Sequence, residues 1–315
     1  MTRASLDPGV RAFLDRMAEA TRGLAAFETL TPSAARAQAE AVRRCLHTAP
    51  PRDMARIEEI VLEDIAPALR LRIYTPPGDA RGVLAYFHGG GWTMFSLDTH
   101  DRLMRAYATG AGMVVVGFDY VLTPEYVFPT ALHQVIDGIL ALRDAERFPA
   151  LARLPLFAGG DSAGANLVVA AALSLRDAGK NILTGLMLTY GVFDSETDRP
   201  SYSLYDGPDY MLTANEMELF WSRYIHDPGM RSSPLASPLH ASLAGLPRVS
   251  MTIAECDVLR DENLTFAQKL RNANVNVDAK VYPGTTHSFI EAFEMAAVAK
   301  NAVDDQCKWL KTWGP

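Results

Sequence analysis

Residues 154–173, LPLFAGGDSAGANLVVAAAL, combine two apolar runs with a serine that has a glycine two positions away on each side. The first run, Leu154–Ala158, is typical of a buried strand, and the second, Ala165–Leu173, of a buried helix. Such glycines permit a sharp strand-to-helix turn, which holds Ser162 in a strained backbone geometry above the sheet edge. We therefore predict a nucleophile elbow at Ser162. The alternative is a serine near a helix start, with glycines that only serve packing.

The alternation of apolar strands and helices continues on both sides of this stretch. Strands are predicted at 57–61, 69–74, 83–87, 113–118, 154–158, 184–190, 249–254 and 277–282, and helices at about 98–109, 130–146, 164–178, 260–273 and 289–311. Apolar strands without polar alternation, separated by helices, indicate a mostly parallel sheet covered on both faces. The predicted fold class is therefore α/β, with ligands bound beyond the carboxyl ends of the strands.

Two segments fall outside this alternation. Residues 1–50 are predicted to be helical, because Val10, Phe13 and Met17 recur at helical spacing and a helix start signal stands at 31–33. Residues 194–227 form a long excursion between two strands and are rich in Tyr, Phe and Trp. Long excursions inside a compact domain commonly act as lids or caps, and a solvent-facing helical decoration is the alternative.

Composition argues against several classes of function. The 30 Lys and Arg residues face 37 Asp and Glu residues, so the net charge of −7 favours neither nucleic acid nor an anionic membrane as a partner. The three cysteines, Cys45, Cys256 and Cys307, suit a reducing compartment and lack metal-ligand spacing. The start lacks a signal-peptide core, and the longest apolar run is too short to span a bilayer. We expect a cytoplasmic protein that uses no metal or other cofactor.

A serine nucleophile needs a base, and the base needs an orienting carboxylate. Of seven histidines, His287 stands just past the last predicted strand, at the same sheet edge as Ser162. Asp257 directly follows the preceding strand, whereas Asp261 and Glu262 would begin a helix, where acidic residues stabilise the helix dipole. The order Ser162, Asp257, His287 is the order of α/β-hydrolase triads. We predict these three residues as the catalytic triad.

The run His88-Gly89-Gly90-Gly91-Trp92 directly follows the strand predicted at 83–87. Glycines let backbone N–H groups approach a substrate, and such groups stabilise the oxyanion that forms during acyl transfer. We predict an oxyanion hole made by Gly89 and Gly90, with Ala163 from the elbow. A phosphate-binding loop is the alternative, but no G-x-G-x-x-G or Walker pattern follows.

Together, the ordered motifs over about residues 52–312 resemble those of the bacterial hormone-sensitive-lipase-like esterases. The motifs are HGGGW at 88–92, DYVLTPE at 119–125, GDSAG at 160–164, DVLRDE at 257–262 and HSF at 287–289. The resemblance implies an α/β-hydrolase fold, the triad and oxyanion residues given above, and hydrolysis of carboxylic esters without a cofactor. It also implies a catalytic domain at 51–315, with a cap made from residues 1–50 and the 194–227 excursion, and it suggests a homodimer formed through the last edge strand.

The same resemblance places the substrate pocket between the oxyanion loop and the cap. Trp92 and Phe95 follow the oxyanion glycines, and Phe95 stands where the family often has glycine. Tyr190 and Phe193 close the strand that leads into the excursion. Large side chains there would shorten the pocket, so we expect esters of short acids, with about two to six carbons. In the alternative, Phe95 packs in the core beneath the loop.

Two other functions remain compatible with these residues. Amides or formamides could be hydrolysed by the same triad. A non-catalytic ligand-binding protein on this fold is the second alternative, because fold does not determine function. In the plant gibberellin receptors of the family the catalytic histidine is replaced, whereas this sequence has His287 in a matching context. A small-molecule ester is therefore the expected substrate.

Overall fold

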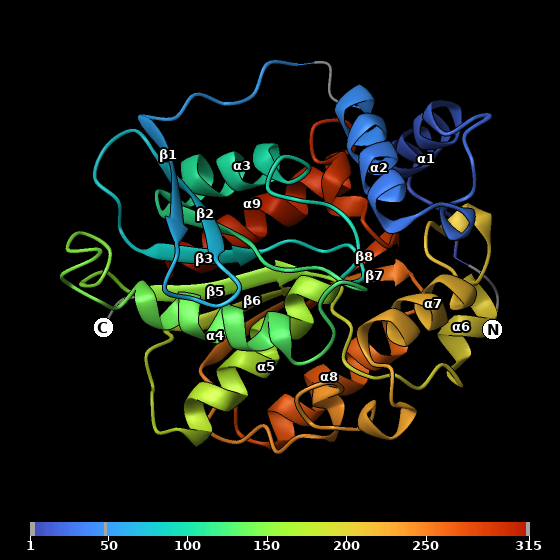
Figure 1. The fold of residues 1–315 in the computed structure, drawn as a ribbon. Coiled ribbons are helices and arrows are strands. Elements are labelled where there is room, and N and C mark those ends of the chain that lie inside the picture. The colour runs from blue at the N-terminus through green and yellow to red at the C-terminus, as the bar shows by residue number, and fades with distance from the viewer. Residues whose placement is uncertain (1–3, 47–48, 313–315) are drawn as a thin grey trace.

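The computed structural model describes residues 4–46 and 49–312 and is built around one sheet (Figure 1). Within these residues the sheet has eight strands in the order β1-β2-β4-β3-β5-β6-β7-β8. Strand β2 is antiparallel to β1 and β4, and all other neighbours are parallel. The strands are β1 (Arg56–Leu62), β2 (Leu69–Thr75), β3 (Val83–Phe87), β4 (Val114–Asp119), β5 (Leu156–Asp161), β6 (Gly185–Thr189), β7 (Arg248–Cys256) and β8 (Val277–Thr286).

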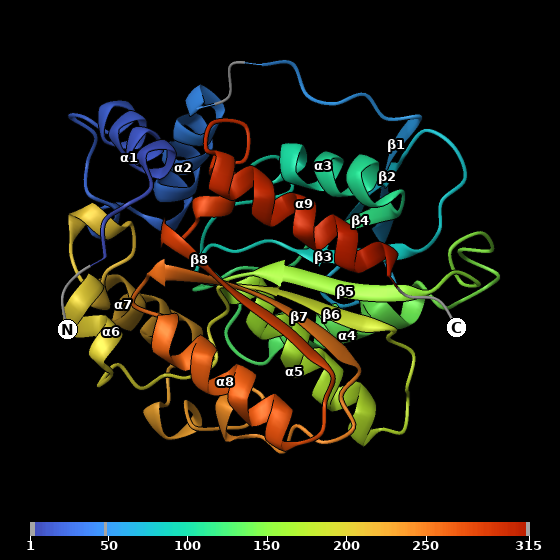
Figure 2. The ribbon, with the colours of Figure 1, turned by 180° about the vertical axis from the view of Figure 1, so that it is seen from behind.

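Helices cover both faces of the sheet, as the apolar strands predict (Figure 2). Strands β3, β5 and β6 bury every residue, because neither of their faces meets water. One face carries α3 (Asp101–Ala111) and α9 (Ala297–Lys311). The other carries α4 (Thr130–Ala141), α5 (Ala163–Asp177) and α8 (Arg260–Asn272). The predicted α/β class with a mostly parallel sheet is confirmed.

Four further helices lie beyond the carboxyl ends of the strands, and we call them the helical layer (Figure 1). Two come from the N-terminal segment and two from the 194–227 excursion: α1 (Pro8–Ala20), α2 (Pro32–Leu46), α6 (Pro200–Tyr205) and α7 (Ala214–Tyr224). Local sequence fixes the starts of α1 and α7. Asp7 accepts hydrogen bonds from the first N–H groups of α1, and Thr213 and Glu216 form a capping box at the start of α7.

The segment predicted as one helix at 289–311 is divided in the structure. A short 3-10 turn at Phe289–Ala292 comes first, and α9 begins only at Ala297. Phe289 and Ile290 are fully buried, as are several residues of α9, so apolar spacing alone does not reveal the break. The turn directly follows His287 and fixes the direction in which the chain leaves β8.

Candidate active site

Ser162 lies in a tight turn between β5 and α5, with φ +52° and ψ −119°. A Cβ atom at Gly160 would lie 2.6 Å from the carbonyl oxygen of Phe87, and one at Gly164 only 2.0 Å from the same atom. Both glycines are therefore required because the end of β3 passes directly against the turn. This contact brings Ser162 close to the glycine-rich loop that follows β3.

Three side chains from three different strand ends form a continuous hydrogen-bonded chain. His287 Nε2 lies 3.0 Å from Ser162 Oγ, and His287 Nδ1 lies 2.8 Å from Asp257 Oδ2. The second carboxylate oxygen of Asp257 accepts the backbone N–H of Leu259 at 3.0 Å, which orients the carboxylate. All three side chains are buried. In this arrangement the imidazole can accept the serine proton while the carboxylate holds its other nitrogen.

Asp261 and Glu262, which follow Asp257 in the sequence, have other hydrogen-bond partners. Asp261 accepts the backbone N–H of Ser201 at 2.8 Å and pairs with Arg260, so it fixes the start of α6. Glu262 accepts the backbone N–H of Phe193 at 2.7 Å, and burial raises the pKa of its carboxyl well above the usual range. Neither forms a hydrogen bond with the imidazole.

The glycine-rich loop differs from the prediction at Gly89. The Gly89 N–H donates to Asp161 Oδ1 at 3.1 Å inside the protein, so it is already used and cannot serve an oxyanion. Gly90 and Gly91 instead line the cavity beside Ser162, and their N–H groups form no hydrogen bond to the described residues. Their φ values of +116° and +58° turn the backbone there. The expectation for Gly89 is thereby corrected, and the N–H groups of this loop that remain available beside Ser162 are those of Gly90 and Gly91.

Asp161 connects the elbow to this loop. Besides Gly89, its Oδ1 accepts the Tyr86 hydroxyl at 2.8 Å and lies 3.5 Å from His100 Nε2. Burial alone would raise the pKa of Asp161, but His100 and the Tyr86 hydrogen bond bring it below the usual value. Burial also lowers the pKa of His88 to about 4, and its Nδ1 contacts the Gly89 carbonyl at 2.7 Å. His88 therefore braces the loop as a neutral ring.

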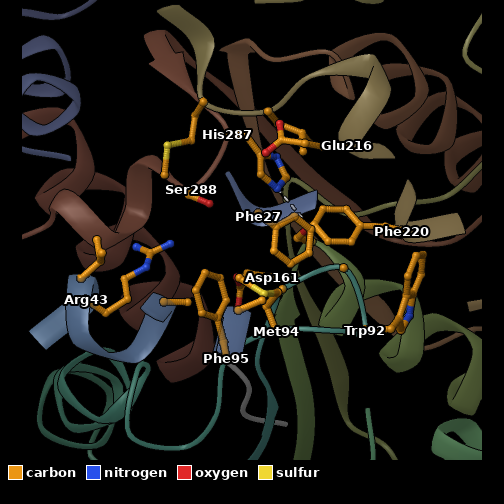
Figure 3. Close-up of a pocket in the computed structure, with 18 of the residues that line it drawn as sticks. Phe27, Arg43, Trp92, Met94, Phe95, Asp161, Glu216, Phe220, His287 and Ser288 are labelled. Carbon is orange, nitrogen blue, oxygen red and sulfur yellow. Dashed lines mark hydrogen bonds between the residues drawn. The ribbon is translucent and has the colours of Figure 1, made fainter. Parts of the chain in front are cut away.

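A cavity of about 280 Å³ opens over Ser162 and His287, and we call it the site cavity (Figure 3). Its walls come from the glycine-rich loop and from the helical layer, with the 3-10 turn at Phe27–Thr29 between α1 and α2. Most lining side chains are apolar: Met17, Phe27, Ala35, Ala39, Val42, Trp92, Met94, Phe95, Val192, Met211, Leu212, Met217 and Phe220. An apolar cavity with a few polar groups suits a small organic substrate.

Comparison with known proteins agrees with this geometry. A family model described as alpha/beta hydrolase fold matches residues 84–291. The chain belongs to the α/β-hydrolase family. An ethyl acetate hydrolase of Pseudomonas putida is 36% identical over 228 residues, which cover 70% of this chain and 71% of that protein.

Solved structures of esterases resemble this hydrolase over nearly their whole length. A hyperthermophilic esterase from the archaeon Pyrobaculum calidifontis has a TM-score of 0.91 at 30% identity, with 98% of each chain covered. A thermostable esterase from Pseudomonas putida has a TM-score of 0.89 at 29% identity, with 98% of this chain and 97% of that chain covered. The family inferred from the sequence motifs is thereby confirmed.

Of the four residues predicted to shape the hydrolase pocket, two line the site cavity. Phe95 is half-buried in its wall, and Trp92 is fully buried, with its ring stacked 4.0 Å from that of Tyr224. The other two do not line it, which corrects the prediction. Tyr190 packs against the His287 ring at 4.7 Å between centroids. Phe193 is stacked on the Phe266 ring of α8 at 4.1 Å and belongs to the core.

The sequence motifs of the hydrolase do not predict two charged residues of the cavity wall. Arg43 of α2 is buried and forms an ion pair with Glu291, and burial lowers the pKa of its guanidinium to about 10. Glu216 of α7 lines the cavity near His287. Neither belongs to a catalytic motif, because both come from the helical layer and reach the site only through the tertiary fold.

The helical layer is anchored to the hydrolase loops by Arg36 of α2. Its guanidinium pairs with both oxygens of Glu125 at 2.6 and 2.9 Å. It also donates to the backbone carbonyls of Thr93 and Thr123 at 2.8 and 2.6 Å. The hydrogen bonds with Arg36 lower the pKa of Glu125 below its usual value. One side chain thus links α2 to the loops after β3 and β4.

Metal ligation and membrane insertion depend on the arrangement of the side chains and on the helices of the described residues. Over residues 4–46 and 49–312, no three side chains of His, Cys, Asp or Glu are arranged to hold a metal ion. Over the same ranges, no helix has the length and apolar character needed to cross a membrane.

Proposed function

We propose that this α/β-hydrolase is a carboxylesterase that cleaves small, short-chain carboxylic esters through an acyl-enzyme on Ser162. The observation that carries the proposal is the hydrogen-bonded chain from Asp257 through His287 to Ser162, which ends in an apolar cavity. The similarity to an ethyl acetate hydrolase and to solved esterases supports ester substrates. Amide hydrolysis by the same residues is less favoured, because the relatives are esterases.

In the first half of the reaction, Ser162 Oγ attacks the ester carbonyl carbon and His287 Nε2 takes the serine proton. Asp257 holds the opposite ring nitrogen, so that the lone pair of Nε2 faces the serine and the imidazolium is stabilised. The carbonyl oxygen gains a negative charge, which the N–H groups of Gly90, Gly91 and Ala163 stabilise. Ala163 is the first residue of α5, where the positive end of the helix dipole adds to this effect.

The imidazolium then gives its proton to the leaving alcohol and the ester C–O bond breaks, which completes the first half and leaves the acyl group on Ser162. A water molecule then loses a proton to His287 Nε2 and attacks the acyl-serine. Collapse of this intermediate releases the carboxylic acid and restores the serine hydroxyl. The net reaction is ester plus water to acid plus alcohol, and it needs no electron acceptor.

The helical layer serves as the cap in this proposal. The helices at 8–46 and the 194–227 excursion close the site cavity, in line with a cap drawn from residues 1–50 and a catalytic domain at 51–315. Phe95 and Trp92, in the cavity wall, limit the space for the substrate. A cytoplasmic location, the lack of a nucleic-acid partner and a homodimer through the β8 edge remain predictions from the sequence.

An organophosphate such as diethyl p-nitrophenyl phosphate should inactivate the enzyme by modifying Ser162 alone. The phosphoryl group mimics the attacked carbonyl, and the Ser162 hydroxyl is activated by its hydrogen bond to the His287 imidazole. Ser288 is the matched control, because its side chain lines the same cavity. Peptide mass spectrometry should find the adduct on Ser162 in the wild type and in Ser288→Ala, and find none in Ser162→Ala. An adduct on Ser288, or on Ser162→Ala, would refute the assignment of the nucleophile.

Phe95→Gly should shift the preferred ester toward longer chains. The Phe95 ring occupies the cavity wall, and its φ of +73° suits glycine, so the backbone should tolerate the change. Each methylene that enters the new space should contribute about 0.8 kcal/mol. The measurement is kcat/KM for two ester series, one lengthened on the acyl side and one on the alcohol side. An unchanged optimum in both series, together with a lower melting temperature, would place Phe95 in the core instead.

A further inference from the structure

One part of the site cavity combines a carboxylate with aromatic rings. Glu216 and Phe220 come from α7, and Phe27 comes from the 3-10 turn that precedes α2. All three line the cavity, and the rings of Phe27 and Phe220 lie 5.7 Å apart (Figure 3). Aromatic faces attract cations, and an acidic group beside them strengthens that attraction.

The Glu216 carboxylate accepts its hydrogen bonds from neutral groups. Its Oε2 accepts the N–H and the hydroxyl of Thr213 at 2.9 and 2.8 Å, whereas no hydrogen bond joins its Oε1 to any described residue. Over residues 4–46 and 49–312, no Lys, Arg or His forms a salt bridge with it. Burial raises the pKa of this carboxyl above its usual value. A cation on the substrate would therefore stabilise the ionised form of this carboxylate.

The other charges of the cavity wall are compensated. Arg43 is paired with Glu291, and Asp161 is held by Tyr86, Gly89 and His100. The negative charge of Glu216 is therefore the feature of this wall that a substrate can use.

A cation already lies over one of these rings. The Arg223 guanidinium is 4.8 Å from the centre of the Phe27 ring. The Glu28 carboxylate acts electrostatically on both Arg223 and Glu216, so it offsets the positive charge and adds to the negative one. Arg223 itself forms no salt bridge with Glu216, so it does not neutralise that carboxylate.

The position of Glu216 indicates which part of the substrate it meets. His287 Nε2 returns the proton to the leaving oxygen, so the alcohol part of a bound ester lies beside His287. The His287 ring is close enough to Glu216 to act on its carboxyl electrostatically, and both line the same cavity. A group a few bonds beyond the leaving oxygen can therefore reach the carboxylate.

We propose that Glu216, Phe27 and Phe220 form a subsite for a positively charged alcohol, so that the enzyme prefers esters of amino alcohols. This inference rests on the proposed esterase function and specifies its substrate. The substrate is an ester whose alcohol carries an ammonium group, and water cleaves it to the carboxylic acid and the amino alcohol. The ammonium group contacts the aromatic faces and pairs with the carboxylate, while the scissile carbonyl lies over Ser162.

Two acetate esters of equal shape test the proposal. Acetylcholine carries a trimethylammonium group, and 3,3-dimethylbutyl acetate has the same outline without charge. The measured quantity is the ratio of their kcat/KM values, in which size and acyl chemistry cancel. Glu216→Gln is the main variant, because glutamine keeps the capping-box hydrogen bonds and removes only the charge. Glu218→Gln is the matched control, since this exposed residue of the same helix pairs with Arg231 and does not line the cavity.

In the wild type and in Glu218→Gln, the ratio should favour acetylcholine by about tenfold. In Glu216→Gln it should fall about tenfold, and in Phe27→Leu about threefold. Choline should likewise inhibit ethyl acetate hydrolysis more strongly than 3,3-dimethylbutan-1-ol, and Glu216→Gln should remove the difference.

Three outcomes would overturn the subsite: a wild-type preference for the neutral ester, a ratio that Glu216→Gln leaves unchanged, or failure to cleave either ester while ethyl acetate is cleaved. Failure to cleave ethyl acetate as well would instead contradict the esterase function itself.

Discussion

Ser162→Ala and His287→Ala are each expected to lower kcat for ethyl acetate by about 10⁵- to 10⁶-fold. Each change breaks the 3.0 Å contact through which the imidazole activates the hydroxyl. The two residues act as one unit, so the double variant should be little slower than either single variant. Steady-state kinetics gives the rates, and circular dichroism and thermal melting should show that both variants remain folded. A folded variant with near-wild-type turnover would contradict the triad.

The same prediction separates the two candidate acids. Asp257→Asn should lower kcat on the order of 10⁴-fold, because an amide in this position favours the wrong imidazole tautomer. Asp261→Asn is the matched control, since its side chain contacts Ser201 and Arg260 and does not reach His287. It should cost less than about tenfold, through a small shift of α6. The opposite ranking would move the acid to Asp261.

Gly164→Ala should lower kcat by about 10²-fold, although it replaces neither Ser162 nor His287. The new Cβ atom would lie 2.0 Å from the Phe87 carbonyl oxygen and 2.7 Å from that of His88. These are backbone atoms that cannot rotate away, so the end of β3 and the loop with Gly90 and Gly91 must move. Displaced N–H donors stabilise the oxyanion poorly, and the strain should also cost about 1–3 kcal/mol of unfolding free energy.

Gly110→Ala provides the control for this overpacking. Gly110 lies in α3, and a Cβ atom there would meet the Cys307 sulfur at 2.6 Å. It is also a helical glycine in a crowded contact, but its neighbour is a side chain and it does not line the cavity. We expect lower thermal stability and a kcat within about twofold of the wild type. Equal losses of kcat in both variants would show that Gly164 acts through stability alone.

The parts of the site that sequence reasoning found are those whose positions depend on local geometry and topology. Two glycines predict the turn at Ser162. Asp257 and His287 come directly after strands whose carboxyl ends meet at one edge of the sheet. Chain order and the predicted strand ends are therefore enough to predict that these three residues lie together.

What sequence reasoning missed depends on tertiary contacts. Gly89 and Gly91 are equivalent in the sequence, and only the contact of the Gly89 N–H with Asp161 distinguishes them. Its position after β6 predicts Tyr190 in the pocket, but its ring packs against His287. Arg43 and Glu216 carry no motif and approach the site only because the helical layer folds over it. Apolar periodicity and motif spacing carry no information about such contacts.

The helical layer and the sheet contribute different parts of the site, so the substrate range and the chemical step can be changed separately. Ser162, Asp257 and His287 follow strands of the sheet, whereas the rest of the cavity lining comes largely from a leading segment and from one insertion. Arg36 joins the leading segment to the sheet loops through a few hydrogen bonds. Exchange of these two segments between related enzymes, with the Arg36 contacts preserved, is therefore a route to new substrate ranges that leaves the chemical step intact.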